Sequence, residues 1–175
     1  MANTQSICTS FVGELLLGAH QFGTVVLTSR KGLVNPVKDT FKALLVKTSA
    51  TVNATQTNVG TPGSGTPTTA NIGTNEVSGL GYTAGGVEAT NTVAPATTTT
   101  SVSTGTAYWT PSASFVYTGV TITVPFDTVV LYNATQKGKT VSVHTFTSQN
   151  VVIGTFTLTM PANTITTALL RFSTI

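Results

Sequence analysis

Few side chains in this sequence could carry acid–base or nucleophilic chemistry. Nucleophilic catalysis needs a nucleophile, a base and an orienting group that converge, and a glycosidase needs two carboxylates about 5–10 Å apart. No serine lies in a GxSxG sequence, no motif pairs two carboxylates, and neither an HExxH sequence nor an Asp-rich loop indicates a metal site. We therefore expect no enzyme activity, no cofactor and no metal site. The histidines and carboxylates considered are His20, His144, Glu14, Asp39, Glu76, Glu88 and Asp127.

Each of the more reactive side chains has a structural interpretation. His144 lies in a segment of alternating hydrophobicity, where we expect a structural histidine. His20 follows a predicted helix, where a cation would interact favourably with the helix dipole. Cys8 is the only cysteine, which excludes an internal disulfide and a cysteine-based zinc site. Five aromatic residues could form a sugar-binding platform, but such side chains more often pack in a core or an interface, and we predict packing for Tyr82, Tyr108, Trp109, Tyr117 and Tyr132.

The glycine-rich segment at 76–86 does not have the glycine spacing of a nucleotide-binding loop. Its glycines do not follow the GxGxxG pattern, and no strand–helix pair flanks it. We expect these glycines to provide tight turns or close approach between backbones.

Threonine largely replaces charged residues in this chain. Only 7% of the 175 residues are charged, against about 25% in an average domain, whereas 39 are threonine. Threonine favours strands, and its hydroxyl tolerates water. Two explanations stay open: a bias of the source genome, or a surface that lies against neighbours in an assembly or projects outside a cell.

The charge balance and the apolar runs exclude several partners. A net charge of +3 is too small to argue for nucleic acid. The cations around Asp39 indicate a solvated loop or a contact with an acidic partner; they are Arg30, Lys31, Lys38, Lys42 and Lys47. The longest apolar stretch, 15–19, is far shorter than the roughly 20 residues of a membrane helix, and the N-terminal residues do not resemble a secretory signal. We expect no membrane partner.

Helical periodicity is confined to residues 4–17. Ile7, Phe11 and Leu15 recur at intervals of four, with Val12 and Leu16 predicted on the same stripe. Asn3 or Thr4 could begin this helix and Gly18 could end it. A helix this short must dock to persist, either over one end of a β core or, as an arm, on another subunit.

The rest of the chain predicts strands and loops. Periodicity of two and turn residues at short intervals favour an antiparallel β-sandwich or barrel. We expect one domain over 1–175, with an N-terminal helix or arm at 1–22 and a loop-rich insertion region at 48–106. The predicted strands are 24–28, 40–46, a short one around 107–109, 120–126, 128–132, 140–146, 155–160 and 166–173.

Several strings resemble a family of small virion structural proteins of tailed bacteriophages, and together they span most of the chain. The most distinctive is GYTAGG at 81–86; this chain carries extra residues at roughly 29–38 and 56–70. The other matching strings are 1–11 (MANTQSICTSF), 14–16, Gly18, His20, Phe22, 39–43 (DTFKA), 76–79 (EVSG), 141–146 (VSVHTF) and 156–161 (FTLTMP).

The resemblance implies a function without catalytic residues. It implies a capsid decoration or cement protein on the virion surface, which binds the major capsid protein and stabilises contacts between capsid subunits as a homo-oligomer, a trimer. The alternative is a tail, neck or fibre component that takes part in attachment. No cofactor and no nucleic acid follow from either role.

Overall fold

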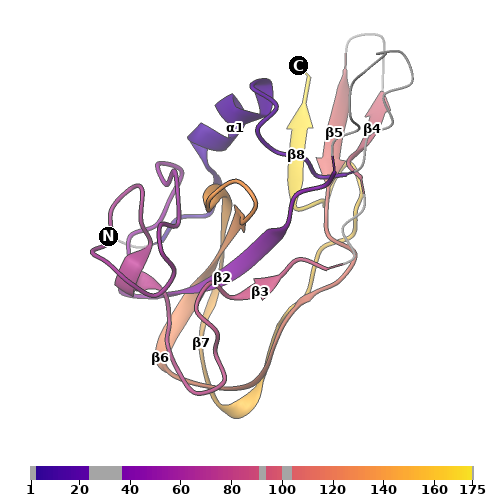
Figure 1. The fold of residues 1–175 in the computed structure, drawn as a ribbon. Helices are drawn as coiled ribbons and strands as arrows, with labels where there is room; N and C mark the ends of the chain where they lie inside the picture. The colour runs from indigo at the N-terminus through magenta and orange to yellow at the C-terminus, as the bar shows by residue number, and fades with distance from the viewer. Residues whose placement is uncertain (1–2, 24–36, 91–93, 100–103, 175) are drawn as a thin grey trace.

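The computed structural model describes residues 3–23, 37–90, 94–99 and 104–174 (Figure 1). Its strands form two antiparallel sheets, a five-stranded one in the order β1-β7-β6-β2-β3 and a three-stranded one in the order β4-β5-β8. The all-β prediction with one short N-terminal helix is therefore confirmed. The elements are β1 (Ser6–Ile7), α1 (Thr9–Leu16), β2 (Phe41–Lys47), the 3₁₀ turn η1 (Gly73–Asn75), β3 (Val87–Glu88), β4 (Ala96–Thr99), β5 (Gly105–Trp109), β6 (Phe115–Asn133), β7 (Lys139–Leu158) and β8 (Leu170–Ser173).

A long bent hairpin of β6 and β7 organises the molecule. The sequence predicts two strands in each of these segments, but the structure has one continuous strand in each. The ladder between them shifts register several times between Tyr117 and Thr128. Pro125, expected near an edge or a strand end, lies inside β6 at one of these shifts, where a missing N–H donor is tolerated. The hairpin bends at the end of the molecule opposite α1 and the three-stranded sheet (Figure 1).

The N-terminal helix is shorter than predicted. Residues before Thr9 are extended because the backbone pairs with its neighbours: Ser6 and Ile7 pair with β7, and the N–H of Cys8 donates to the Val141 carbonyl over 3.0 Å. The predicted end at Gly18 is confirmed. Gly18 has a φ of 67°, and hydrogen bonds from Gly18 and Ala19 to the preceding turn close the helix.

The helix covers the core with one narrow side. Phe11 is fully buried and Leu15 packs against the core. Val12 and Leu16, predicted on the buried stripe, are instead 44% and 89% exposed. This part of the prediction is wrong because the helix has only eight residues and rests on Phe11, which leaves the neighbouring side of the helix in solvent.

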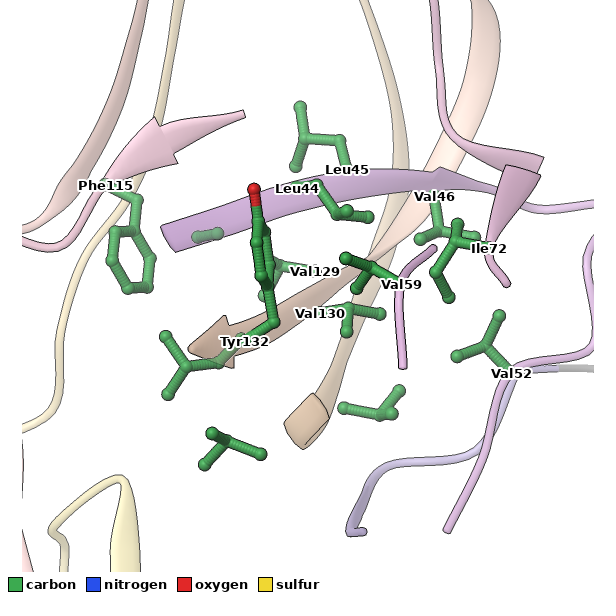
Figure 2. Packing of buried hydrophobic residues seen from close by; sticks show 14 of the residues in the cluster. Leu44, Leu45, Val46, Val52, Val59, Ile72, Phe115, Val129, Val130 and Tyr132 are labelled. Carbon is green, nitrogen blue, oxygen red and sulfur yellow. The ribbon is translucent and has the colours of Figure 1, made fainter. Parts of the chain in front are cut away.

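The core lies between the hairpin, β2 and the loop-rich region. Across the ladder Leu44 of β2 pairs with Val130 of β6 and Leu45 pairs with Val129, and apolar side chains of the long loops lie near them (Figure 2). The described part of the region 48–106 contributes buried residues to the core, among them Val52, Val59, Ile72 and Val77.

The remaining predicted strands agree with the structure to different degrees. The strand at 40–46 is β2, and the strand around 107–109 is β5. The last strand is β8, which is shorter than the predicted 166–173. The predicted strand at 24–28 lies outside the described residues. Within the described ranges, no helix combines the length and apolar character needed to cross a membrane.

Candidate functional site

The structure brings His20 together with two of the carboxylates. Nε2 of His20 lies 2.7 Å from Oε2 of Glu14, whose other oxygen pairs with Lys139. On the opposite side of the ring, Nδ1 lies 3.0 Å from Nδ2 of Asn133, which also lies 2.6 Å from Oδ2 of Asp39. Glu14, His20, Asn133 and Asp39 thus form one hydrogen-bonded row between α1, the segment before β2 and the end of β6.

The bonding pattern assigns a structural role to this row. Oδ1 of Asn133 accepts from the backbone N–H of Gln136, so its Nδ2 is the donor toward Nδ1 of His20. Nδ1 accepts, and the ring proton is on Nε2, where it donates to Glu14. His20 is 7% exposed and both nitrogens are occupied. It is therefore a neutral, enclosed link between elements, whereas the sequence suggested a cation at the helix end.

His144 and Asp127 form hydrogen bonds with residues outside this row. Nε2 of His144 lies 2.8 Å from the hydroxyl of Ser142, and burial lowers the pKa of His144 to about 4. Asp127 accepts a 2.8 Å hydrogen bond from Nδ2 of Asn3. Glu88 is exposed on β3. Among the described residues, no group of three or more His, Cys, Asp and Glu side chains could hold a metal ion.

Glu76 is the most deeply buried carboxyl group. Its Oε1 accepts hydrogen bonds from the Tyr82 hydroxyl at 2.8 Å and from the Gly85 N–H at 2.7 Å. Its Oε2 faces the backbone of Gly63 without a hydrogen bond of acceptable geometry. Burial raises the pKa of Glu76, because the charged form loses its water. Its surroundings are closed, so this carboxyl group supports the fold.

The aromatic residues around Glu76 pack as predicted. The rings of Tyr82 and Tyr117 stack with centroids 6.0 Å apart, and Tyr117 donates to the Ala43 carbonyl. Burial and the nearby Glu76 raise the pKa of Tyr132 to about 12 and those of Tyr82 and Tyr117 further. Trp109 is 2% exposed. Four of the five aromatic side chains thus serve the core, and Tyr108 is half-buried on β5.

The glycine-rich segment lies directly on neighbouring backbone. A Cβ added to Gly86 would lie 1.8 Å from the Ala43 carbonyl oxygen, and one added to Gly79 would lie 2.0 Å from that of Thr121. The expectation of close backbone approach is confirmed. This approach fixes the loop between Gly79 and Gly81 against β6 and leaves Leu80 at its tip.

Large apolar side chains project into solvent at the hairpin bend. Leu80, Val152 and Ile153 are 80%, 66% and 85% exposed. Leu80 and Ile153 lie close together because both contact Thr121. The backbone of Leu80 forms an antiparallel β-bridge with Thr121, and the N–H of Ile153 donates to the Thr121 hydroxyl over 3.1 Å. We call these three residues the bend patch. A second exposed group consists of Val12 and Leu16 on α1 and Leu17 directly after it.

One residue of the bend patch also has a strained backbone conformation. Ile153 has a φ of 48°, in the left-handed region that β-branched residues avoid. Such a conformation costs about 1–3 kcal/mol and is concentrated at functional positions. A strained, exposed isoleucine is thus the part of the surface that folding alone explains least. Sequence reasoning missed it, since the strand predicted in this part of the chain begins only at residue 155.

Comparison with family models, with curated protein sequences and with solved structures finds no match to this chain.

Proposed function

We propose that this protein is a structural component of a bacteriophage virion that decorates or cements the capsid. It binds the outer shell and stabilises contacts between capsid subunits. The proposal rests on the resemblance of the sequence strings to small virion proteins, and the observation that carries it in the structure is the bend patch.

The bend patch suits contact with another protein. Its segments, 77–87, 114–126 and 145–170, contain no charged residue. Soluble monomers seldom expose contiguous apolar patches larger than a few hundred Å², and grouped exposed apolar side chains therefore favour an interaction site. Burying one such side chain yields about 1.5–3 kcal/mol. On a symmetric shell, many weak contacts of this size add up to firm attachment when copies are linked.

Substitution at the strained residue tests the proposal without damaging the fold. Asparagine tolerates a positive φ better than isoleucine, so Ile153→Asn removes the apolar side chain while relieving strain. Its matched control is Val37→Asn, since Val37 is also exposed (76%) but lies outside the bend patch. Binding is measured by co-sedimentation with shells of the parent virus stripped of this protein.

We expect the wild-type protein and Val37→Asn to sediment with the shells. Ile153→Asn should bind at least tenfold more weakly. A wild-type protein that does not bind shells, or that cryo-electron microscopy of virions locates on the tail alone, would support the alternative role in the tail, neck or fibre.

A further inference from the structure

An apolar hollow lies between α1 and the three-stranded sheet. Its volume is about 180 Å³, and it is lined by Leu15 of α1, Trp109 of β5, and Leu170 and Phe172 of β8 together with other apolar or aromatic side chains. Helix α1 and β8 lie side by side here, with the rings of Phe11 and Phe172 6.2 Å apart (Figure 1). Among the described residues that line the hollow, none is charged.

The size and the lining of the hollow suit a branched apolar side chain. An apolar cavity of roughly 150 Å³ in a protein core stays dry and accepts benzene. A leucine side chain is smaller than benzene, so a hollow of about 180 Å³ can hold one. Arg171 is no obstacle, because successive side chains of a strand face opposite sides and its neighbours Leu170 and Phe172 are the ones that line the hollow.

Two leucines next to the hollow are left in solvent by their own chain. Leu16 and Leu17 are 89% and 84% exposed and directly follow Leu15, which lines the hollow. Neither of them lines it in its own chain. Val12, four residues before Leu16 and so on the same side of the helix, is also exposed. A surface that supplies apolar side chains thus adjoins a hollow that accepts one.

The end of α1 brings no unpaired charge to such a contact. Glu14 is the only charged residue of the helix, and its carboxylate pairs with His20 and Lys139 of the same chain. An apolar helix end and an apolar hollow can therefore meet without an ion being taken out of water, which is costly. A helix of eight residues is also marginal in isolation, so a contact that covers its exposed side would stabilise it.

We propose that this protein associates with further copies of itself by packing Leu16 and Leu17 of one copy into the apolar hollow of another. Each chain carries both halves of the contact. Two copies that exchange these leucines form a dimer, and copies joined head to tail form a closed ring such as a trimer. The leucine-to-hollow contact is the same in both arrangements. The inference does not rest on the proposed function, because the contact forms in the isolated protein.

A second copy accounts for the surface better than an unrelated partner does. An apolar side chain of another protein could fill the hollow, but it would leave Leu16 and Leu17 in solvent beside it. A second copy buries the leucines and fills the hollow with the same contact. Both exposed features are then explained by one partner that is always present.

The first test removes the leucines. A variant with Leu16→Gln and Leu17→Gln keeps side chains that favour a helix, and both positions are exposed, so its fold should be unchanged. We expect the wild type to form oligomers in sedimentation velocity runs over a range of concentrations, and the variant to associate at least tenfold more weakly. The matched control is Val37→Gln, at a residue that is 76% exposed but lies outside this surface; it should associate like the wild type.

The second test fills the hollow and leaves the leucines in place. Ala107 on β5 lines the hollow, so Ala107→Leu occupies part of its space from within the same chain. This variant should also associate at least tenfold more weakly. Circular dichroism spectra and melting temperatures show that each variant is folded.

Mixing the two variants distinguishes this contact from a general loss of apolar surface. The double glutamine variant keeps its hollow, and Ala107→Leu keeps Leu16 and Leu17. A mixed pair therefore has one intact contact, whereas either variant alone has none. We expect the mixture to associate more tightly than either variant alone and more weakly than the wild type, measured by fluorescence anisotropy with one variant labelled.

The inference is overturned by a wild-type protein that stays monomeric at all accessible concentrations, by an oligomer that neither variant weakens, or by a mixture that associates no better than its components. An oligomer that Ile153→Asn dissociates would place the contact at the bend patch and overturn the inference as well. Shell co-sedimentation of Ile153→Asn reports on shell binding, and the leucine variants report on self-association, so either idea can fail without the other.

Discussion

Asn133 donates from Nδ2 to Oδ2 of Asp39 over 2.6 Å and so joins the end of β6 to the segment before β2. The same nitrogen satisfies Nδ1 of His20, and all three side chains are buried. One amide group thus donates to two buried partners.

Asn133→Ala should therefore be strongly destabilising. It removes one of three hydrogen-bond donors from the buried Asp39 carboxylate, which keeps those of Gln21 and Gln136. It also leaves Nδ1 of the buried His20 ring without its donor, and an unsatisfied buried group costs about 1–3 kcal/mol. We expect a loss of about 2–4 kcal/mol in the free energy of unfolding, measured with urea. Asn163→Ala, at an exposed position, is the control and should change the stability by less than about 0.5 kcal/mol. Equal stabilities of the two variants would contradict a supporting role for the row.

Glu76→Gln should stabilise the protein increasingly as the pH rises. Because burial raises the pKa of Glu76, the folded state holds its proton more tightly than the unfolded state. The contribution of protonated Glu76 to the free energy of unfolding is complete below the ordinary pKa of 4.5. It declines as the pH rises through the pKa of the folded state. Glutamine keeps an acceptor for Tyr82 and Gly85 and does not ionise. The difference in melting temperature, variant minus wild type, should be larger at pH 7 than at pH 4; a constant difference would be evidence against this account.

His144 should produce the opposite dependence. Its pKa falls from 6.5 to about 4 in the folded protein, so the unfolded state binds more protons between these values. The contribution of neutral His144 to the free energy of unfolding is complete above pH 6.5. It declines toward pH 4 by about 1–3 kcal/mol. His144→Gln retains a partner for Ser142 and should remove this decline. Unfolding curves of both proteins at pH 4, 5.5 and 7 measure it, and parallel profiles would show that His144 is not responsible.

Gly86→Ala should disrupt packing against β2. The added Cβ would lie 1.8 Å from the Ala43 carbonyl oxygen, and Gly86 has a φ of 67°. A backbone atom cannot move aside as a flexible side chain can, so we expect a loss of more than about 3 kcal/mol. Gly13→Ala is the matched control: nothing lies within 4 Å of its Cβ, and in a helix alanine is favoured over glycine by about 1 kcal/mol. In thermal melts, Gly86→Ala should have a lower melting temperature than the wild type, and Gly13→Ala a higher one.

The sequence predicts where β-strands occur, but it does not predict that β6 and β7 are each one continuous strand. Alternation at 120–126 and 140–146 indicates β structure because side chains of a strand face opposite sides in turn. Pro125 and the polar run 147–150 interrupt that pattern, although the chain stays in the ladder by shifting register. At the N-terminus, the backbone pairing of Cys8 with Val141 prevails over a helical pattern of side chains.

The arrangements around the candidate sites depend on contacts between distant residues. His20 and Asn133 are 113 positions apart, and no local pattern relates them. Close approach by the glycines of 76–86 can be anticipated from their number, but Ala43 and Thr121 as the surfaces they meet cannot. The positive φ of Ile153 likewise could not be predicted, because residue 153 is neither glycine nor asparagine, the residues that most often adopt it.

The enclosed position of Cys8 has a practical consequence. The residue is 0% exposed, and burial raises the pKa of its thiol, which therefore stays protonated and unreactive. Since the chain has no other sulfhydryl group, a cysteine introduced at Leu80 or Lys137 would be the sole target of maleimide reagents. Fluorophores or photo-crosslinkers could then be attached at a chosen point without first removing a native residue.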